Sequence, residues 1–123
     1  MVFAEVLNDV TSKIEGCIGI VVMGMDGIPI ERHQPARAVE GAPNFDMLAT
    51  ECTSLLRATR QASEEVDAGA LRELIFMTEK VVVLTVAITK DYVLFAAVES
   101  GTNYGKTRFH MKRAALTLEK EFR

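Results

Sequence analysis

Between residues 70 and 99 the chain alternates three apolar segments with two short polar links. The segments run from Ala70 to Thr78, from Val81 to Thr89 and from Tyr92 to Glu99, and the links are Glu79-Lys80 and Lys90-Asp91. Links of two residues join antiparallel neighbours, whereas parallel strands need a long crossover. The region therefore predicts a three-stranded antiparallel meander, whose turn types stay open because neither link contains glycine.

A second pair of strands is expected near the N-terminus. The run Cys17 to Met23 is dominated by isoleucine and valine, and its length favours a buried strand over a helix. Asp26-Gly27 then suits a tight hairpin turn. The returning strand, Ile28 to Arg32, contains Pro29, which lacks the N–H that a central strand needs. The hairpin should therefore lie at one edge of the sheet.

Three amphipathic helices are predicted from apolar residues at three- and four-residue steps. The first carries Phe3, Val6, Leu7, Val10 and Ile14, and Gly16 ends it. The second begins after the N-cap Asn44, stops at Gly69, and should bury Phe45, Leu48, Cys52, Leu55, Leu56, Ala62 and Val66. The third, from about Tyr104 to Phe122, should bury Met111, Ala115, Leu118 and Phe122, with Phe109 and Leu116 widening the stripe.

The order helix, two strands, helix, three strands, helix predicts the fold class. Strands and helices each need a partner for their apolar sides. We expect an α+β fold in which a five-stranded antiparallel sheet is flanked by three helices. The 123 residues are enough for one core without disulfide or metal staples, so residues 1–123 should form a single domain. Cys17 and Cys52 lie in apolar runs and are expected to be buried thiols in a reducing cytoplasm.

The composition and motifs exclude several classes of function. A net charge of -3 gives no reason to expect a nucleic acid, and no signal peptide or membrane-spanning run is present, so we expect a cytoplasmic protein without membrane insertion. The segment Gly101 to Thr107 is one residue short of the phosphate-binding spacing GxxxxGK[ST]. His33 and His110 do not form a pair at metal-ligand spacing. We therefore expect no catalytic residues, no cofactor and no metal.

Two features of the sequence are not explained by the core of a monomer. Lys106 and Arg108 lie in the opening turn of the last helix, where the helix dipole disfavours cations, and Lys112 and Arg113 extend this cluster. Either these side chains are simply solvated or they form a secondary docking site. The segment Ala70 to Thr78 contains neither proline nor lysine, although it is a candidate for the second sheet edge, and an unguarded edge normally needs pairing or cover.

Two segments carry a resemblance to a known family. They are Gly19-Ile20-Val21-Val22-Met23-Gly24-Met25-Asp26-Gly27 and Gly105-Lys106-Thr107-Arg108-Phe109-His110-Met111-Lys112-Arg113-Ala114-Ala115. Together with the element order, they resemble the Roadblock/LC7 family, in particular its bacterial MglB-like members.

The resemblance implies a dimer, a partner and a set of contact residues. Roadblock/LC7 proteins continue their sheet across two chains, here through Leu71, Arg72, Glu73, Leu74, Ile75 and Phe76. The two middle helices, here Asn44 to about Val66, then lie side by side. In MglB-like members this face engages a Ras-like, MglA-like small GTPase and stimulates GTP hydrolysis by reshaping the GTPase's own site. The corresponding exposed contacts here are Thr50, Glu51, Ser54, Arg57 and Gln61.

Several alternatives stay open at this point. The dimer is formed by two copies or by a copy and a paralogue. Arg57 or Arg60 acts as an arginine finger in trans, or neither does. The dimer is a GTPase regulator, a scaffold that anchors an assembly without affecting hydrolysis, or a small-molecule sensor, although no convergent polar set defines a ligand site.

Overall fold

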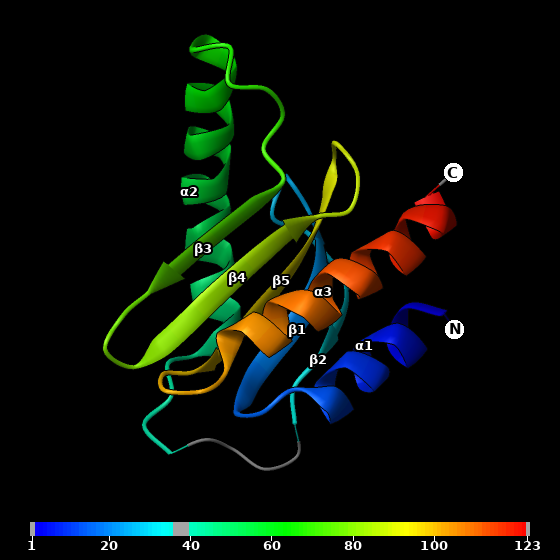
Figure 1. Cartoon of the computed structure of the whole chain (residues 1–123), viewed down its shortest axis with the longest axis vertical. Coiled ribbons are helices and arrows are strands. Elements are labelled where there is room, and N and C mark those ends of the chain that lie inside the picture. Colours follow the sequence, from blue (N-terminus) through cyan, green and yellow to red (C-terminus); the bar gives the residue numbers. More distant parts are fainter. Residues whose placement is uncertain (1, 36–39, 123) are drawn as a thin grey trace.

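A computed structural model describes residues 2–35 and 40–122. The elements follow in the order α1 (Val2–Lys13), β1 (Cys17–Gly24), β2 (Pro29–His33), α2 (Phe45–Glu65), β3 (Glu73–Met77), β4 (Val81–Ala87), β5 (Tyr92–Glu99), α3 (Tyr104–Glu119) and a short 3-10 helix, η1 (Lys120–Phe122). The strands form one antiparallel sheet in the order β2-β1-β5-β4-β3 (Figure 1). The predicted α+β architecture is confirmed.

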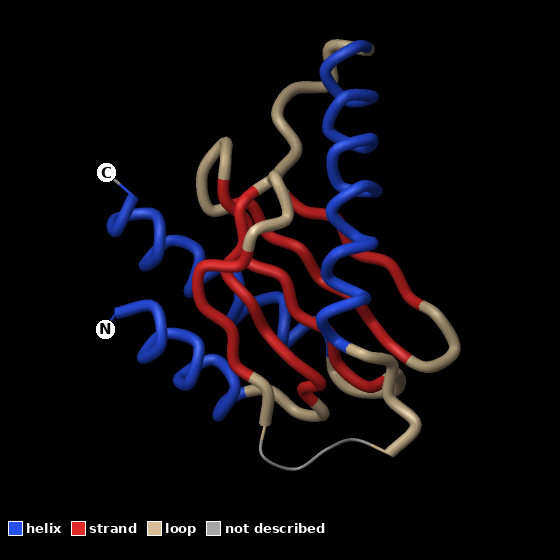
Figure 2. The backbone as a smooth tube through the Cα atoms, turned by 180° about the vertical axis from the view of Figure 1, so that it is seen from behind, coloured by secondary structure: helices blue, strands red, loops and turns tan. Residues whose placement is uncertain are grey.

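The sheet separates two layers of helices. Helices α1 and α3 lie side by side on one face, and α2 lies on the other (Figures 1 and 2). Side chains alternate between the two faces along each strand. In β5, Leu94, Ala96 and Val98 join the core beneath α1 and α3, whereas Phe95 and Ala97 join the core beneath α2. The central strands are therefore buried on both sides.

The two sheet edges lie where the sequence predicts them. β2, with Pro29 as its first residue, is one edge, and β3 is the other. The strands differ in extent from the prediction: β3 is shorter than residues 70–78, β4 ends at Ala87, and β2 continues past Arg32 to His33. Residues 70–72 are outside β3 because the chain approaches the sheet there from the far end of α2 (Figure 1). Pro35, Gly41 and Pro43 predict one longer loop from Arg32 to Asn44, and part of this loop falls outside the described residues.

Helix α2 begins as predicted, but its second half does not follow the prediction. Asn44 caps the helix by accepting a hydrogen bond from the Met47 N–H at 3.0 Å. The helix ends at Glu65, before Gly69, and Asp67 takes the left-handed conformation with φ 56°. Leu56 is the last buried residue, and the helix beyond it extends past the sheet (Figures 1 and 2). The expected burial of the apolar side chains in this half is therefore wrong.

Helix α3 buries a narrower stripe than predicted. Met111, Ala115 and Leu118 are buried as expected, but Phe109 and Leu116 are 54% and 66% exposed. The sheet covers only one side of this helix, and both residues lie on the opposite side. Within the described parts of the chain, no helix combines the length and the apolar character needed to cross a membrane.

Candidate interaction surface

The open edge of β3 presents unpaired backbone groups. The Arg72 carbonyl accepts from the Ala87 N–H, and the Thr78 N–H donates to the Val81 carbonyl, both at 2.8 Å, so these two residues face β4. Backbone groups in an antiparallel pair point alternately toward the neighbour and away from it. Glu73, Ile75 and Met77 therefore direct their N–H and C=O groups outward, away from the sheet.

The side chains of β3 are half-covered by their own chain. Leu74 and Phe76 pack against the core on the α2 side, and Ile75 packs against the core on the α1 and α3 side. Met77 is 61% exposed. Of the six residues predicted for a dimer interface, Leu71 and Arg72 precede the strand and four lie on it. The structure thus gathers the predicted set at one open edge.

The predicted basic cluster makes an internal contact. Arg108 Nε and Nη2 donate to Glu73 Oε1 and Oε2 at 2.6 and 2.9 Å, and Lys112 Nζ lies 3.4 Å from Oε2. The hydrogen bond from Arg108 is the main cause that lowers the pKa of the Glu73 carboxyl, and it also raises the pKa of Arg108. Anchoring β3 to α3 is therefore a physical reason for cations near the start of this helix. Lys106 is exposed in the same turn.

The predicted contact residues on α2 are all exposed. Thr50, Ser54, Arg57 and Gln61 follow steps of four, three and four residues and so form one stripe along the helix. Glu51 lies to one side of this stripe. The structure thus brings four of the five predicted residues onto a single accessible face.

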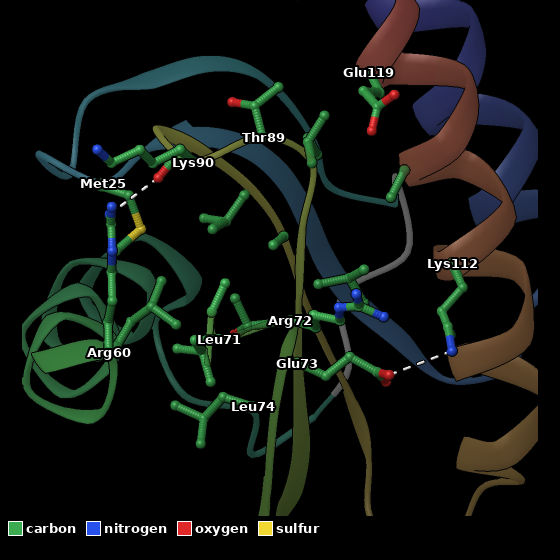
Figure 3. Close-up of a pocket in the computed structure, with 18 of the residues that line it drawn as sticks. Met25, Arg60, Leu71, Arg72, Glu73, Leu74, Thr89, Lys90, Lys112 and Glu119 are labelled. Atoms are coloured by element: carbon green, nitrogen blue, oxygen red, sulfur yellow. Dashed lines mark hydrogen bonds and ion pairs between the residues drawn. The ribbon is translucent and has the colours of Figure 1, made fainter. Parts of the chain in front are cut away.

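Two arginines on α2 hold neighbouring turns. Arg57 Nη1 donates to the Met25 carbonyl at 2.7 Å, in the turn between β1 and β2. Arg60 Nη1 donates to the Lys90 carbonyl at 3.0 Å, in the turn between β4 and β5, and Arg60 Nε lies 3.4 Å from Glu64 Oε1. Figure 3 shows Arg60 reaching across to this turn. Both guanidinium groups therefore have structural partners within the chain.

A second apolar stripe of α2 faces outward, although its periodicity predicts a core position. Leu55 is 46% exposed and Val66 is 74% exposed, and Ala62 is also exposed. Leu48, Leu55 and Ala62 recur at seven-residue steps, so they share one side of the helix. Leu48 borders the same core as Leu74 and Phe76 of β3. The sequence signal for this exposed stripe is that the apolar residues of α2 cover an arc wider than one buried face.

A cavity of about 620 Å³ opens beside the start of β3. Figure 3 shows that Leu71 and Leu74 point toward α2, whereas Glu73 reaches Lys112 of α3. The apolar wall of the cavity includes Met25 and Leu56. Arg60 and Lys112, which also line it, are engaged by protein oxygens. The lining therefore forms a hollow with an apolar wall and does not direct a convergent set of polar groups toward a small ligand.

Reactive groups do not gather at this surface. Burial is the main cause that raises the pKa of the Cys17 thiol to about 11, and burial also raises the pKa of Cys52. Across residues 2–35 and 40–122, the structure contains no group of three or more histidine, cysteine, aspartate or glutamate side chains arranged to hold a metal ion.

The fold and its surface define a class: an α+β domain whose antiparallel sheet ends in the open edge of β3 and whose middle helix extends past the sheet. The Roadblock/LC7 domain model matches residues 3–98 of this chain. The chain therefore belongs to the Roadblock/LC7 family, a family of regulatory, non-catalytic domains. A comparison with curated protein sequences gives no match.

Solved structures of MglB and MglC are similar to this protein. MglB from Thermus thermophilus superposes with a TM-score of 0.84 at 19% identity, covering 97% of this chain and 87% of that one. MglC from Myxococcus xanthus gives a TM-score of 0.71 at 29% identity, covering 98% and 99%. A structure described as MglB with a tetrameric arrangement gives 0.83 at 21% identity, covering 95% and 85%. The fold is thus MglB-like along nearly the whole chain.

Proposed function

We propose that this protein is a cytoplasmic, non-enzymatic homodimer that binds a Ras-like small GTPase and modulates its GTP hydrolysis. The observation that carries the proposal is the open edge of β3, where Glu73, Ile75 and Met77 direct backbone groups outward. A row of such groups beside half-buried apolar side chains is a template for another strand. The partner strand is β3 of a second copy, because an antiparallel pair related by a two-fold axis satisfies both edges at once.

The exposed flank of α2 supports the same assembly. Leu55 and Val66 leave apolar surface open, and the helix beyond Leu56 extends past the sheet. An unsupported helical end of this length is marginal in water. Internal contacts between Gln61 and Glu65 and between Arg60 and Glu64 strengthen it only modestly. Pairing of two copies places the second α2 beside the first and covers this flank.

The paired helices form the proposed GTPase platform. Each copy contributes Thr50, Glu51, Ser54, Arg57 and Gln61, all exposed on α2. The partner class, a Ras-like and MglA-like GTPase, comes from the resemblance to MglB-like members, whose corresponding face engages such a GTPase. The MglB-like fold supports this transfer.

Modulation of hydrolysis does not require a catalytic residue from this chain. A ligand shifts a conformational equilibrium by its differential affinity for the two states. A tenfold shift toward the hydrolysis-competent GTPase needs only ~1.4 kcal/mol of difference. Arg57 and Arg60 are held by the Met25 and Lys90 carbonyls, which favours this mode over an inserted arginine finger.

GTP turnover by the cognate GTPase, measured with and without this protein, tests the proposal. We expect turnover to change on addition of the protein and to saturate with its concentration. Binding with unchanged turnover would instead support the second candidate, a dimeric scaffold. Absence of binding to any Ras-like GTPase encoded by the same genome would contradict both the regulator and its named partner.

A further inference from the structure

The outer face of α3 carries two exposed apolar residues that the monomer leaves uncovered. Phe109 is 54% exposed and Leu116 is 66% exposed. They are seven residues apart and therefore lie on the same side of the helix. The buried residues Met111, Ala114 and Leu118 lie on the other side, against the sheet. Phe109 and Leu116 thus contribute to an outward stripe, not to the core.

A basic stripe runs directly beside this apolar pair. Lys106, Arg113 and Lys120 also recur at seven-residue steps and are exposed. Each lies three or four residues from Phe109 or Leu116, the spacing of neighbours on a helix surface. The Arg113 guanidinium carbon is 5.7 Å from the centre of the Phe109 ring. We call these five residues, Lys106, Phe109, Arg113, Leu116 and Lys120, the α3 outer face.

The charge of this segment is opposite to that of the whole chain. Residues 104–120 contain five basic side chains and one acidic side chain, whereas the chain has a net charge of -3. Arg108 and Lys112 are turned toward Glu73. The α3 outer face is therefore distinct from the Arg108 and Lys112 pair that anchors β3.

We propose that the α3 outer face binds an acidic amphipathic helix of a partner protein. Apolar side chains of that helix would cover Phe109 and Leu116, and its carboxylates would meet the basic stripe. An amphipathic helix places residues at the same spacing as the two stripes of α3. Charge complementarity of this kind sets specificity and association rate.

The surroundings of α3 favour a helix over an extended polyanion. Helix α1 lies beside α3 in the same layer (Figure 1) and exposes Glu5 and Asp9. A flat anionic membrane or a nucleic acid spread over this layer would meet those carboxylates as well. A single helix laid along Phe109 and Leu116 covers a narrower strip of this layer, in which only Arg113 shares a groove with Glu5 and Asp9.

This site lies on the opposite side of the sheet from the proposed GTPase platform. Helix α3 lies on the face of the sheet opposite α2 (Figures 1 and 2), and the exposed Phe109 and Leu116 lie on the side of α3 opposite its buried residues. Leu116 also lines the cavity beside the start of β3, so variants at this residue must be shown to leave the oligomeric state unchanged. A protein with both sites would hold a GTPase on one face and an acidic partner on the other.

The test uses the full chain and a fluorescent synthetic peptide with leucines at helical spacing and glutamates elsewhere. A scrambled peptide of equal composition is the control, and binding is followed by fluorescence anisotropy. We expect the helical peptide to bind more tightly than the scrambled one and to weaken with added salt. Amide shifts in an NMR titration should concentrate at residues 104–120.

Matched variants locate the binding. Arg113→Glu, and Phe109→Ser combined with Leu116→Ser, should each weaken binding by about tenfold or more, a difference of one order in the dissociation constant. Ile28→Ser changes an exposed apolar residue in the turn between β1 and β2 and should have no effect. Sedimentation of the α3 variants should match the wild type, which separates this site from the dimer.

Three results would overturn the proposal. The first is equal binding of the helical and scrambled peptides, or no binding of either. The second is wild-type affinity in the α3 variants. The third is binding of phosphatidylserine vesicles or single-stranded DNA that these variants abolish, with no binding of the peptide.

Discussion

Arg108 and Glu73 are joined by two parallel hydrogen bonds of 2.6 and 2.9 Å. Glu73 is the first residue of β3, and Arg108 lies in the opening turns of α3. The pair therefore fixes the start of the open edge strand to the helix layer on one face of the sheet. Two parallel bonds also restrict orientation more than a single contact does.

Removing the Glu73 charge should reduce stability in a pH-dependent way. The pKa of this carboxyl is lowered in the folded state from its ordinary value of 4.5, so its stabilisation is fully present above that value and is lost as the pH falls through the folded pKa. We expect Glu73→Gln to lower the free energy of unfolding by about 1 kcal/mol near neutral pH. The difference from wild type should shrink below pH 4.5. Urea unfolding at a series of pH values measures it.

An exposed ion pair provides the control for this prediction. Lys13 and Asp9 contact each other at 3.0 Å with side chains 50% and 60% exposed. Lys13→Gln should change stability by less than about 0.5 kcal/mol. A Glu73→Gln variant as stable as wild type at neutral pH, or a difference that persists unchanged in acid, would show that the Arg108 pair does not stabilise the fold.

Gly19 is required because the Phe45 ring lies against its backbone. A methyl group added at Gly19 would lie 2.6 Å from two ring carbons, and Phe45 is only 2% exposed. Phe45 is the first residue of α2 and its ring packs on β1, so the ring has little room to move. We expect Gly19→Ala to cost about 1–3 kcal/mol, as overpacking of a core does. Thermal or urea unfolding measures the loss.

Gly105 provides the matched control for the substitution at Gly19. A methyl group there meets its nearest neighbour, Asn103 Oδ1, at 3.4 Å. Gly105→Ala should be neutral or stabilising by up to about 1 kcal/mol, because alanine favours the helix. The cost of Gly19→Ala should fall when Phe45→Leu is combined with it. Equal effects of the two glycine substitutions would contradict the steric explanation.

The arginines of α2 should not supply catalytic groups to the GTPase. We expect Arg57→Ala and Arg60→Ala to leave the maximal stimulated rate of GTP hydrolysis unchanged at saturating protein. Arg57→Ala should raise the concentration needed for half-maximal effect, since Arg57 lies on the proposed contact stripe. Loss of an arginine finger would lower the maximal rate by about 10³–10⁵. A loss of that size in either variant would show that an arginine finger, and not differential affinity, stimulates hydrolysis.

The sequence was sufficient for the order of the elements and for both sheet edges. Pro29 identified β2 as an edge because proline lacks a ladder donor. The two-residue links after Thr78 and Thr89 identified the meander, since only antiparallel neighbours are joined so briefly. These features act over a few residues, so one sequence displays them directly.

Features that depend on distant partners could not be predicted from periodicity. Arg108 and Glu73 are 35 residues apart, and nothing local joins them. The exposure of Phe109 and Leu116 depends on how much of α3 the sheet covers. The second half of α2 extends past the sheet because the helix is longer than the strands. Its 21 residues span about 31 Å, whereas the seven residues of β4 span about 23 Å. The predicted contact residues on α2 remain predictions.

Sedimentation equilibrium of a matched pair of variants at Met77 tests the assembly most directly. Met77 is exposed, and its N–H points outward from the edge, so Met77→Pro removes a donor that β4 does not use, whereas Met77→Thr keeps it. We predict that wild type and Met77→Thr are dimers at micromolar concentration and that Met77→Pro is a monomer with an unchanged circular dichroism spectrum. A monomeric wild type, or a Met77→Pro variant that remains dimeric, would contradict pairing through β3.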